Sequence, residues 1–216
     1  MNLQKLFEMQ AKLDADITAH HPVQEGENRL EKKVLALLVE LGECAQEWRG
    51  FKFWSNDQES RTKVENKCLE CKGEGFDSYW TDEGQKYDQC ECCCGTGIVG
   101  KSNLLLEEYV DCLHFILSIG NELKIDKTEC EVVELFHWTT ENYFIQLIHL
   151  VTELHRKITN FPIRNKSVNF SLEFIYNGVL RRFLGLSLRL GFTWEQIEQA
   201  YYDKNKVNFE RQEQGY

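Results

Sequence analysis

Proline is nearly absent from this sequence. Pro22 and Pro162 are the only two, so the long stretch between them lacks the residue that most often breaks a helix. Segments that alternate polar and apolar residues, as half-buried strands do, are also few. Long helices are therefore the expected main structure of the chain.

Basic charge and long apolar runs are scarce as well. Lys and Arg number 25 against 35 Asp and Glu, which gives a formal net charge of -10. This excess of negative charge argues against a nucleic-acid partner and against an anionic membrane surface. No run of about 18 uncharged apolar residues is present to cross a membrane, and the first ten residues have no apolar segment of signal-peptide type. We expect a soluble, cytoplasmic protein.

Six segments have the apolar spacing of amphipathic helices. They are Leu3–Ile17, Leu30–Trp48, Leu104–Leu123, Tyr143–Ile158, Phe170–Leu190 and Trp194–Phe209. Gly191 is placed to end one helix, and Thr193 with Gln196 forms a capping-box pattern for the next. With 216 residues and 42% apolar content, the chain can build one sizeable helical core.

The cysteines are unevenly distributed. Six of the nine lie between Cys68 and Cys94, inside a polar, glycine-bearing stretch. We interpret residues 1–55 and 101–216 as one all-α domain, a helical bundle, and residues 56–100 as a small inserted cysteine-rich loop. The other three cysteines sit singly in helical, mostly apolar patterns and are expected to be packed thiols. These three are Cys44, Cys112 and Cys130.

The insertion contains the pattern CxxCxGxG twice, as CLECKGEG at 68–75 and CECCCGTG at 90–97. Paired CxxC units suit a tetrahedral zinc site, for which Cys68, Cys71, Cys90 and Cys93 are the candidate ligands. Cys92 and Cys94 could substitute, and disulfides are the alternative, which fits a cytoplasmic protein poorly. The repeat resembles the zinc-binding segment of J-domain chaperones, which carry four such units. A four-cysteine zinc site has no open position for chemistry, so we expect a structural role and leave open a protein partner.

Clustered carboxylates lie on two strongly apolar helices. Glu40 and Glu43 are on the second predicted helix, and Glu107, Glu108, Asp111 and His114 are on the third. Burying unpaired carboxylates between helices would cost roughly several kcal/mol each. A magnesium site removes that cost, because Mg²⁺ prefers carboxylate oxygens and is often completed by phosphates. Ordinary solvent-facing helices are the alternative. A di-iron site usually needs Glu-x-x-His on two helices, which only Asp111 with His114 approaches.

Four segments together carry a family resemblance. ELGE at 40–43, EWRGFKFW at 47–54, EEYVDCLHF at 107–115 and the terminal YYDKNKVNFERQEQGY resemble the dimeric, all-α dUTP diphosphatases of phages and bacteria, relatives of the MazG-like nucleotide pyrophosphohydrolases. The resemblance implies a homodimer that hydrolyses dUTP to dUMP and pyrophosphate and so limits uracil incorporation into DNA.

The same resemblance implies a cluster of two or more Mg²⁺ ions held by Glu40, Glu43, Glu108 and Asp111. Glu40 and Glu43 would also be catalytic, and Glu43 would orient the attacking water or take its proton. Glu107 is within helical reach of Asp111 too, so the choice of Glu108 rests on the spacing seen in the family.

Substrate contacts are implied in the same way. The phosphate-binding and closing residues would be Lys52, Lys204, Asn205, Asn208, Arg211 and Tyr216. Phe115 and Trp54 would pack on the nucleotide, although core packing is the alternative for Trp54. His114 would border the base, and Gln10 and Asp14 would read its edge.

Asp14 departs from the family pattern, because relatives often have asparagine there. An ionised Asp14 would accept the N3 proton of uracil, but it would equally accept the amino group of cytosine. One alternative is therefore a pyrophosphohydrolase acting on another nucleotide such as dCTP. A second alternative is a non-catalytic helical protein that binds a partner through a zinc knuckle formed by the cysteine-rich loop.

Overall fold

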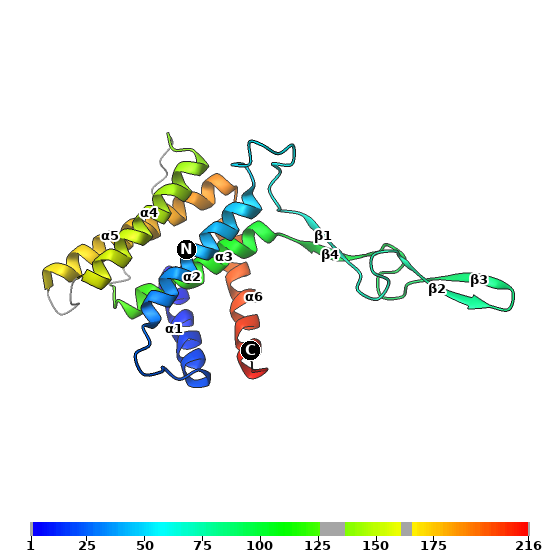
Figure 1. The fold of residues 1–216 in the computed structure, drawn as a ribbon, viewed down its shortest axis with the longest axis horizontal. Coiled ribbons are helices and arrows are strands. Elements are labelled where there is room, and N and C mark those ends of the chain that lie inside the picture. The colour runs from blue at the N-terminus through cyan, green and yellow to red at the C-terminus, as the bar shows by residue number, and fades with distance from the viewer. Residues whose placement is uncertain (1, 126–136, 161–165, 216) are drawn as a thin grey trace. The chain divides into compact units, whose positions relative to one another are not determined.

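The computed structural model describes residues 2–125, 137–160 and 166–215, and this part of the chain contains six α-helices (Figure 1). They are α1 (Leu3–His20), α2 (Arg29–Trp48), α3 (Leu104–Glu122), α4 (Thr140–Asn160), α5 (Lys166–Leu190) and α6 (Trp194–Glu213). Each corresponds to one of the six helices predicted from apolar spacing. None of the helices described is long and apolar enough to cross a membrane.

The chain divides into two compact units. The helical unit consists of Met1–Glu59 and Leu106–Tyr216, and the cysteine-rich unit consists of Ser60–Leu105. The predicted insertion, residues 56–100, overlaps the cysteine-rich unit over residues 60–100.

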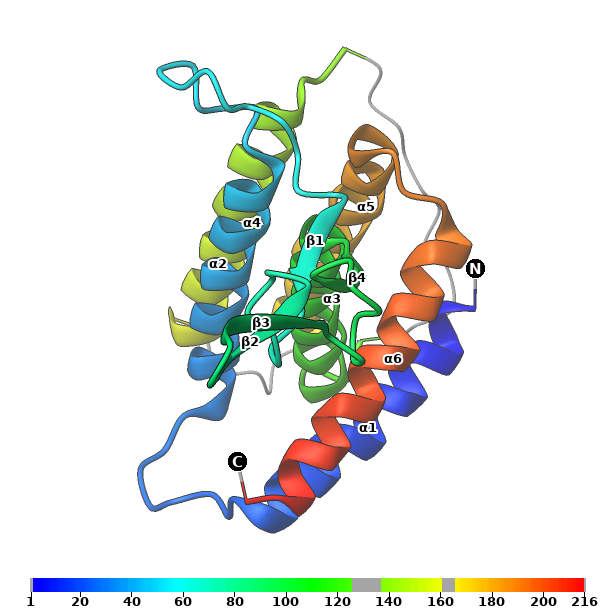
Figure 2. The ribbon, with the colours of Figure 1, turned by 90° about the vertical axis from the view of Figure 1, so that its right-hand side faces the viewer.

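Packing in the helical unit is pairwise around α3. Helices α4 and α5 lie side by side, α1 packs on α6, and α2 packs on α4 (Figures 1 and 2). The α3 side chains Leu113 and Leu117 are fully buried, and burial of each contributes about 1.5–3 kcal/mol. Two buried tyrosines join α3 to α5: the Tyr109 hydroxyl donates to the Phe183 carbonyl at 2.9 Å, and the Tyr176 hydroxyl donates to the Ile116 carbonyl at 2.8 Å.

The helix ends agree with the predicted capping. Thr193 caps α6, its side chain accepts from the Gln196 backbone N–H, and the Gln196 side chain accepts from the Thr193 backbone N–H. Gly191 follows α5 with φ of 79°, a left-handed conformation that costs glycine little. Cys44 and Cys112 are buried, as predicted for packed thiols, whereas Cys130 lies outside the described residues.

The cysteine-rich unit, which the sequence predicted only as a loop, contains two small antiparallel sheets. Strand β1 (Val64–Lys67) pairs with β4 (Ile98–Ser102), and β2 (Phe76–Thr81) pairs with β3 (Gly84–Gln89). These strands have four to six residues and are mostly exposed on both faces. Without a buried face, no alternation of polar and apolar residues marks them in the sequence.

Candidate active site

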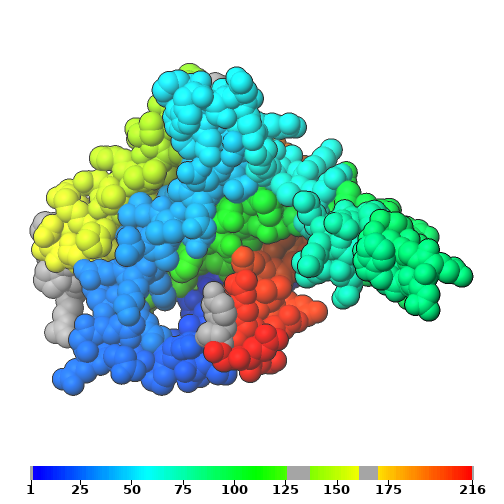
Figure 3. All heavy atoms as spheres, turned by 45° about the vertical axis from the view of Figure 1, so that its right-hand side comes forward, coloured from blue at the N-terminus to red at the C-terminus, as the bar shows by residue number. Residues whose placement is uncertain are grey.

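A cavity of about 570 Å³ opens in the helical unit among α1, α2, α3 and α6. The surface is hollowed between the blue N-terminal segment and the red C-terminal helix (Figure 3). Nine of the residues predicted from sequence line the cavity. They are Gln10 and Asp14 on α1, Glu40 on α2, Asp111, His114 and Phe115 on α3, and Lys204, Asn208 and Arg211 on α6.

Three carboxylates converge beside this cavity. Glu40 on α2 and Glu108 and Asp111 on α3 each offer an oxygen, and these oxygens all lie within 4.8 Å of one another. Glu108 and Asp111 share a face of α3 because they are three residues apart. Glu43, one turn beyond Glu40, is exposed and outside this group, and Glu107 is exposed as well.

The carboxylates raise one another's pKa. Burial, followed by the charges of Asp111 and Glu43, raises the pKa of Glu40 to about 7. Burial and the charges of Asp111, Glu43 and Glu40 raise the pKa of Glu108 to about 7. Burial also raises the pKa of Asp111, although Lys204 opposes this effect. Such a set of oxygen donors, partly buried and mutually repelling, fits a hard divalent cation, which would relieve the repulsion.

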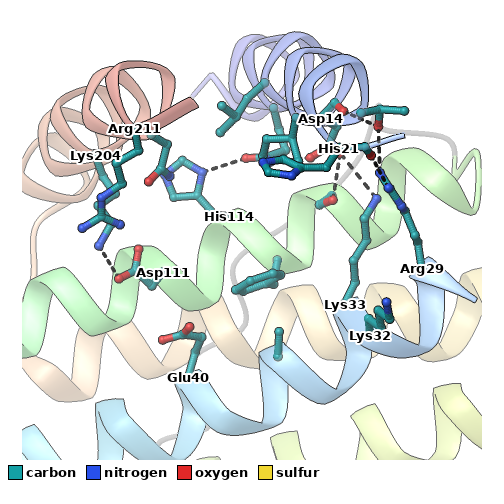
Figure 4. Close-up of a pocket in the computed structure, with 18 of the residues that line it drawn as sticks. Asp14, His21, Arg29, Lys32, Lys33, Glu40, Asp111, His114, Lys204 and Arg211 are labelled. Atoms are coloured by element: carbon teal, nitrogen blue, oxygen red, sulfur yellow. Dashed lines mark hydrogen bonds and ion pairs between the residues drawn. The ribbon is translucent and has the colours of Figure 1, made fainter. Parts of the chain in front are cut away.

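Cationic and amide groups from α6 face the carboxylates. Lys204 Nζ lies 2.5 Å from Asp111 Oδ2 (Figure 4). Asn208 and Arg211 follow Lys204 by four and seven residues, so the three side chains lie along one face of α6. Asn205 is buried, and its Nδ2 has no hydrogen-bond partner within the described residues. Tyr216 lies outside the described residues.

A hydrogen-bonded network joins α1 to α3 at the other end of the cavity. The Gln10 amide donates to Asp14 Oδ1 at 2.8 Å, and the Ser118 hydroxyl donates to Asp14 Oδ2 at 2.8 Å. Gln10 Oε1 accepts from the Tyr201 hydroxyl at 2.9 Å and lies 2.7 Å from Nδ1 of His114. Both carboxylate oxygens of Asp14 thus accept hydrogen bonds from other side chains of the protein.

His114 is held neutral within this network. Burial, assisted by the charge of Lys204, lowers the pKa of His114 to about 3. Because Gln10 Oε1 can only accept, Nδ1 of His114 carries the proton and Nε2 carries the lone pair. Nε2 is buried and has no hydrogen-bond partner among the described residues.

Several lining residues were not predicted from the sequence. One of them, Lys33 on α2, contacts the predicted base-reading residue Asp14. Its Nζ lies 3.8 Å from Asp14 Oδ2 and 2.7 Å from Glu122 Oε2. Its position seven residues before Glu40 places it on the same helical face, a signal that the sequence contains. The other cationic lining residues are Arg29 and Lys32, and Ser118 also lines the cavity.

Two predicted substrate contacts lie elsewhere. Lys52 and Trp54 follow α2 in a turn and are not among the described residues that line the cavity. Trp54 is 66% exposed, so the core-packing alternative for it is wrong. Its ring meets Phe51 and Phe53 edge-on, and Lys52 Nζ lies 5.7 Å from the centre of the Phe51 ring.

The four predicted zinc ligands come together in the cysteine-rich unit. Cys68, Cys71, Cys90 and Cys93 are buried, and their sulfur atoms all lie within 4.8 Å of one another.

Comparison with known proteins gives one family. A family model described as dUTPase matches residues 2–70 and 99–216. The matched segments contain every described residue discussed above for the cavity, whereas Cys71, Cys90, Cys93 and the β2–β3 hairpin lie outside them. No curated protein matches the chain.

Proposed function

Because the chain belongs to the dUTPase family, we propose that it hydrolyses dUTP to dUMP and pyrophosphate with Mg²⁺, and so limits uracil incorporation into DNA. The convergence of Glu40, Glu108 and Asp111 opposite the basic face of α6 is the observation that carries this proposal. A triphosphate needs both features, because its charge must be met by cations on more than one side.

Glu40, Glu108 and Asp111 would hold the cation, and Glu43 would complete the set from the next turn of α2. When bound, Mg²⁺ would neutralise phosphate charge and make a water molecule a better nucleophile. Lys204 and Arg211 would bind the phosphates, with Asn205 and Asn208 beside them. The exposed Glu43 carboxylate is also the proposed group that orients the attacking water or takes its proton.

Base recognition is proposed at the other end of the cavity. The half-buried ring of Phe115 would pack on the base, and Gln10, Asp14 and His114 would read its edge. Lys52 and Trp54 remain proposed contacts, Lys52 with the phosphates and Trp54 with the base. To reach the nucleotide, the turn that carries them must move toward the cavity, or a second subunit must supply them.

A homodimer is the proposed assembly. Two neighbouring helices expose large apolar side chains: Leu35 and Val39 on α2, and Ile145 and Ile148 on α4. A second copy of the chain would cover them, as the family resemblance implies. Sedimentation analysis should give a dimer for the unmodified chain and a monomer for Leu35→Glu. Val23→Glu, a control change at another exposed apolar residue, should stay dimeric.

One alternative substrate is favoured by a specific residue. Asp14, as an ionised acceptor, can take a hydrogen bond from the amino group of cytosine, so dCTP is the second candidate. Purified protein incubated with each deoxynucleoside triphosphate, with Mg²⁺ or with a chelator, should release pyrophosphate fastest from dUTP and only with Mg²⁺. Equal or faster turnover of dCTP would favour the alternative. No release from any nucleotide would favour a non-catalytic binding protein.

A further inference from the structure

The cysteine-rich unit lacks an apolar core. In residues 60–103, all of which the structure describes, the only buried side chains are those of Cys68, Cys71, Cys90 and Cys93. Short segments with so little buried apolar surface usually need a metal or disulfides to fold. The four cysteines are therefore the candidate groups that hold this unit together.

The sulfur positions distinguish a metal from disulfides. Cys68 Sγ lies 3.8 Å from Cys90 Sγ, and Cys71 Sγ lies 3.7 Å from Cys93 Sγ. A disulfide would require about 2.05 Å. A tetrahedron of sulfurs around one zinc ion, with Zn–S bonds of about 2.3 Å, has edges of about 3.8 Å. The observed spacing is that of a metal site.

The backbone supports negative charge on these sulfurs in the same way in both CxxCxGxG repeats. The Gly75 N–H donates to Cys71 Sγ at 3.2 Å, and the Gly97 N–H donates to Cys93 Sγ at 3.2 Å. The repeats are also joined reciprocally: the Cys68 N–H donates to the Gly97 carbonyl, and the Cys90 N–H donates to the Gly75 carbonyl. Each N–H directed at sulfur favours the thiolate, the form that binds metal.

The glycines of the repeat are required by this arrangement. Gly75 and Gly97 have φ of 84° and 73°, where other residues are strained. A Cβ on Gly75 would lie 2.4 Å from the Gly95 carbonyl oxygen, and one on Gly97 would lie 2.3 Å from the Gly73 carbonyl oxygen. The CxxCxGxG pattern thus supplies both the sulfur ligands and the close backbone approach that brings the two repeats together.

We propose that Cys68, Cys71, Cys90 and Cys93 bind one Zn²⁺ as four thiolates, and that this ion folds the cysteine-rich unit. The site is closed, so its role is structural, and it lies largely outside the segments that match the dUTPase family. The proposal is independent of the hydrolysis of dUTP, because metal content is measured whether or not the protein is an enzyme.

Elemental analysis of the full chain, purified without chelator, tests the site. We expect one zinc per chain, loss of that zinc in Cys90→Ser, and retention in Cys94→Ser and Cys92→Ser, whose thiols are exposed. Limited proteolysis should then cut Cys90→Ser within residues 60–105, whereas helical circular dichroism should stay unchanged. Iron in place of zinc, zinc retained by Cys90→Ser, or zinc lost from Cys92→Ser would overturn the assignment.

A second measurement covers the case in which Cys90→Ser does not fold. A mercurial thiol reagent added to unmodified protein should release the zinc as four protected thiols react. Protein that contains no zinc, and in which these cysteines do not react until a disulfide reductant is added, would show disulfides and overturn the proposal.

Discussion

Lys204 on α6 donates a hydrogen bond to Asp111 on α3, with Nζ and Oδ2 2.5 Å apart. Its ammonium group thereby lies beside the same three carboxylates that are proposed to hold Mg²⁺. If Asp111 binds Mg²⁺ as proposed, Lys204 would compete with the cation for Asp111, and nucleotide phosphates would draw Lys204 away from it.

Replacing Lys204 should have opposite effects on the binding of Mg²⁺ and on the binding of the nucleotide. In Lys204→Met, Mg²⁺ should bind several-fold more tightly without nucleotide, because the competing charge is gone. The KM for dUTP should rise by about 10-fold or more, since a charge-assisted hydrogen bond contributes about 1.5–3 kcal/mol. Calorimetric titration and steady-state kinetics measure the two effects. Lys206→Met, which loses only an exposed ion pair with Glu210, is the control and should change neither. Weaker Mg²⁺ binding in Lys204→Met would contradict the competition.

Removing one converging carboxylate should abolish activity but preserve the fold. Asp111→Asn should lower kcat for dUTP by at least about 100-fold, because a neutral amide is a poor ligand for a hard cation. The matched control is Glu107→Gln, since Glu107 is exposed on the same helix and outside the converging group. Near-normal activity of Asp111→Asn, or equal losses in both variants, would refute the assigned ligands.

The raised carboxylate pKa values predict how stability depends on pH. Glu40 and Glu108 have folded-state pKa values of about 7 against 4.5 for the ordinary group, so the folded protein binds more protons between these values. In chelator, the melting temperature should therefore fall as pH rises from about 4.5 to 7. Mg²⁺ should raise the melting temperature more at pH 8 than at pH 5, because protons compete with the cation. An equal increase in melting temperature with Mg²⁺ at both pH values would contradict competition between protons and Mg²⁺ for these carboxylates.

Asp14 should influence the choice of base. In Asp14→Asn, the amide can donate a hydrogen bond to a uracil carbonyl, so the ratio of kcat/KM for dUTP to that for dCTP should rise. Competition assays with both nucleotides measure this ratio. Ser118→Ala serves for comparison, because it removes the hydroxyl that donates to Asp14 but leaves the carboxylate. An unchanged or lower ratio in Asp14→Asn would show that residue 14 does not read the base in the proposed way.

The sequence predicted the features that depend on local spacing. All six helices follow from apolar residues three and four apart, and the two CxxCxGxG repeats identify the cysteines that come together. Predicting that Glu40 and Asp111 converge required knowing that their two helices pack together, and this came from the family resemblance. The strands were missed because β2 and β3 are exposed and carry no pattern of burial.

Two features depend on how the chain is arranged in three dimensions and could not be predicted from the sequence. Arg49 ends α2 in a left-handed conformation with φ of 64°, and this turn sets the direction of the residues that follow. Nothing in the sequence fixes that direction, so the placement of Lys52 and Trp54 away from the cavity was not foreseen. The Ser118 contact with Asp14 joins residues 104 apart in sequence, and only the packing of α1 on α3 brings it about.

The convergence of Glu40, Glu108 and Asp111 on a divalent cation can be tested most directly by crystallography. Crystals of the full chain grown with Mn²⁺ in place of Mg²⁺ would locate the ion through its anomalous scattering. We predict an anomalous peak bonded to oxygens of all three carboxylates. The same three side chains facing solvent, with no peak among them at saturating Mn²⁺, would contradict the account.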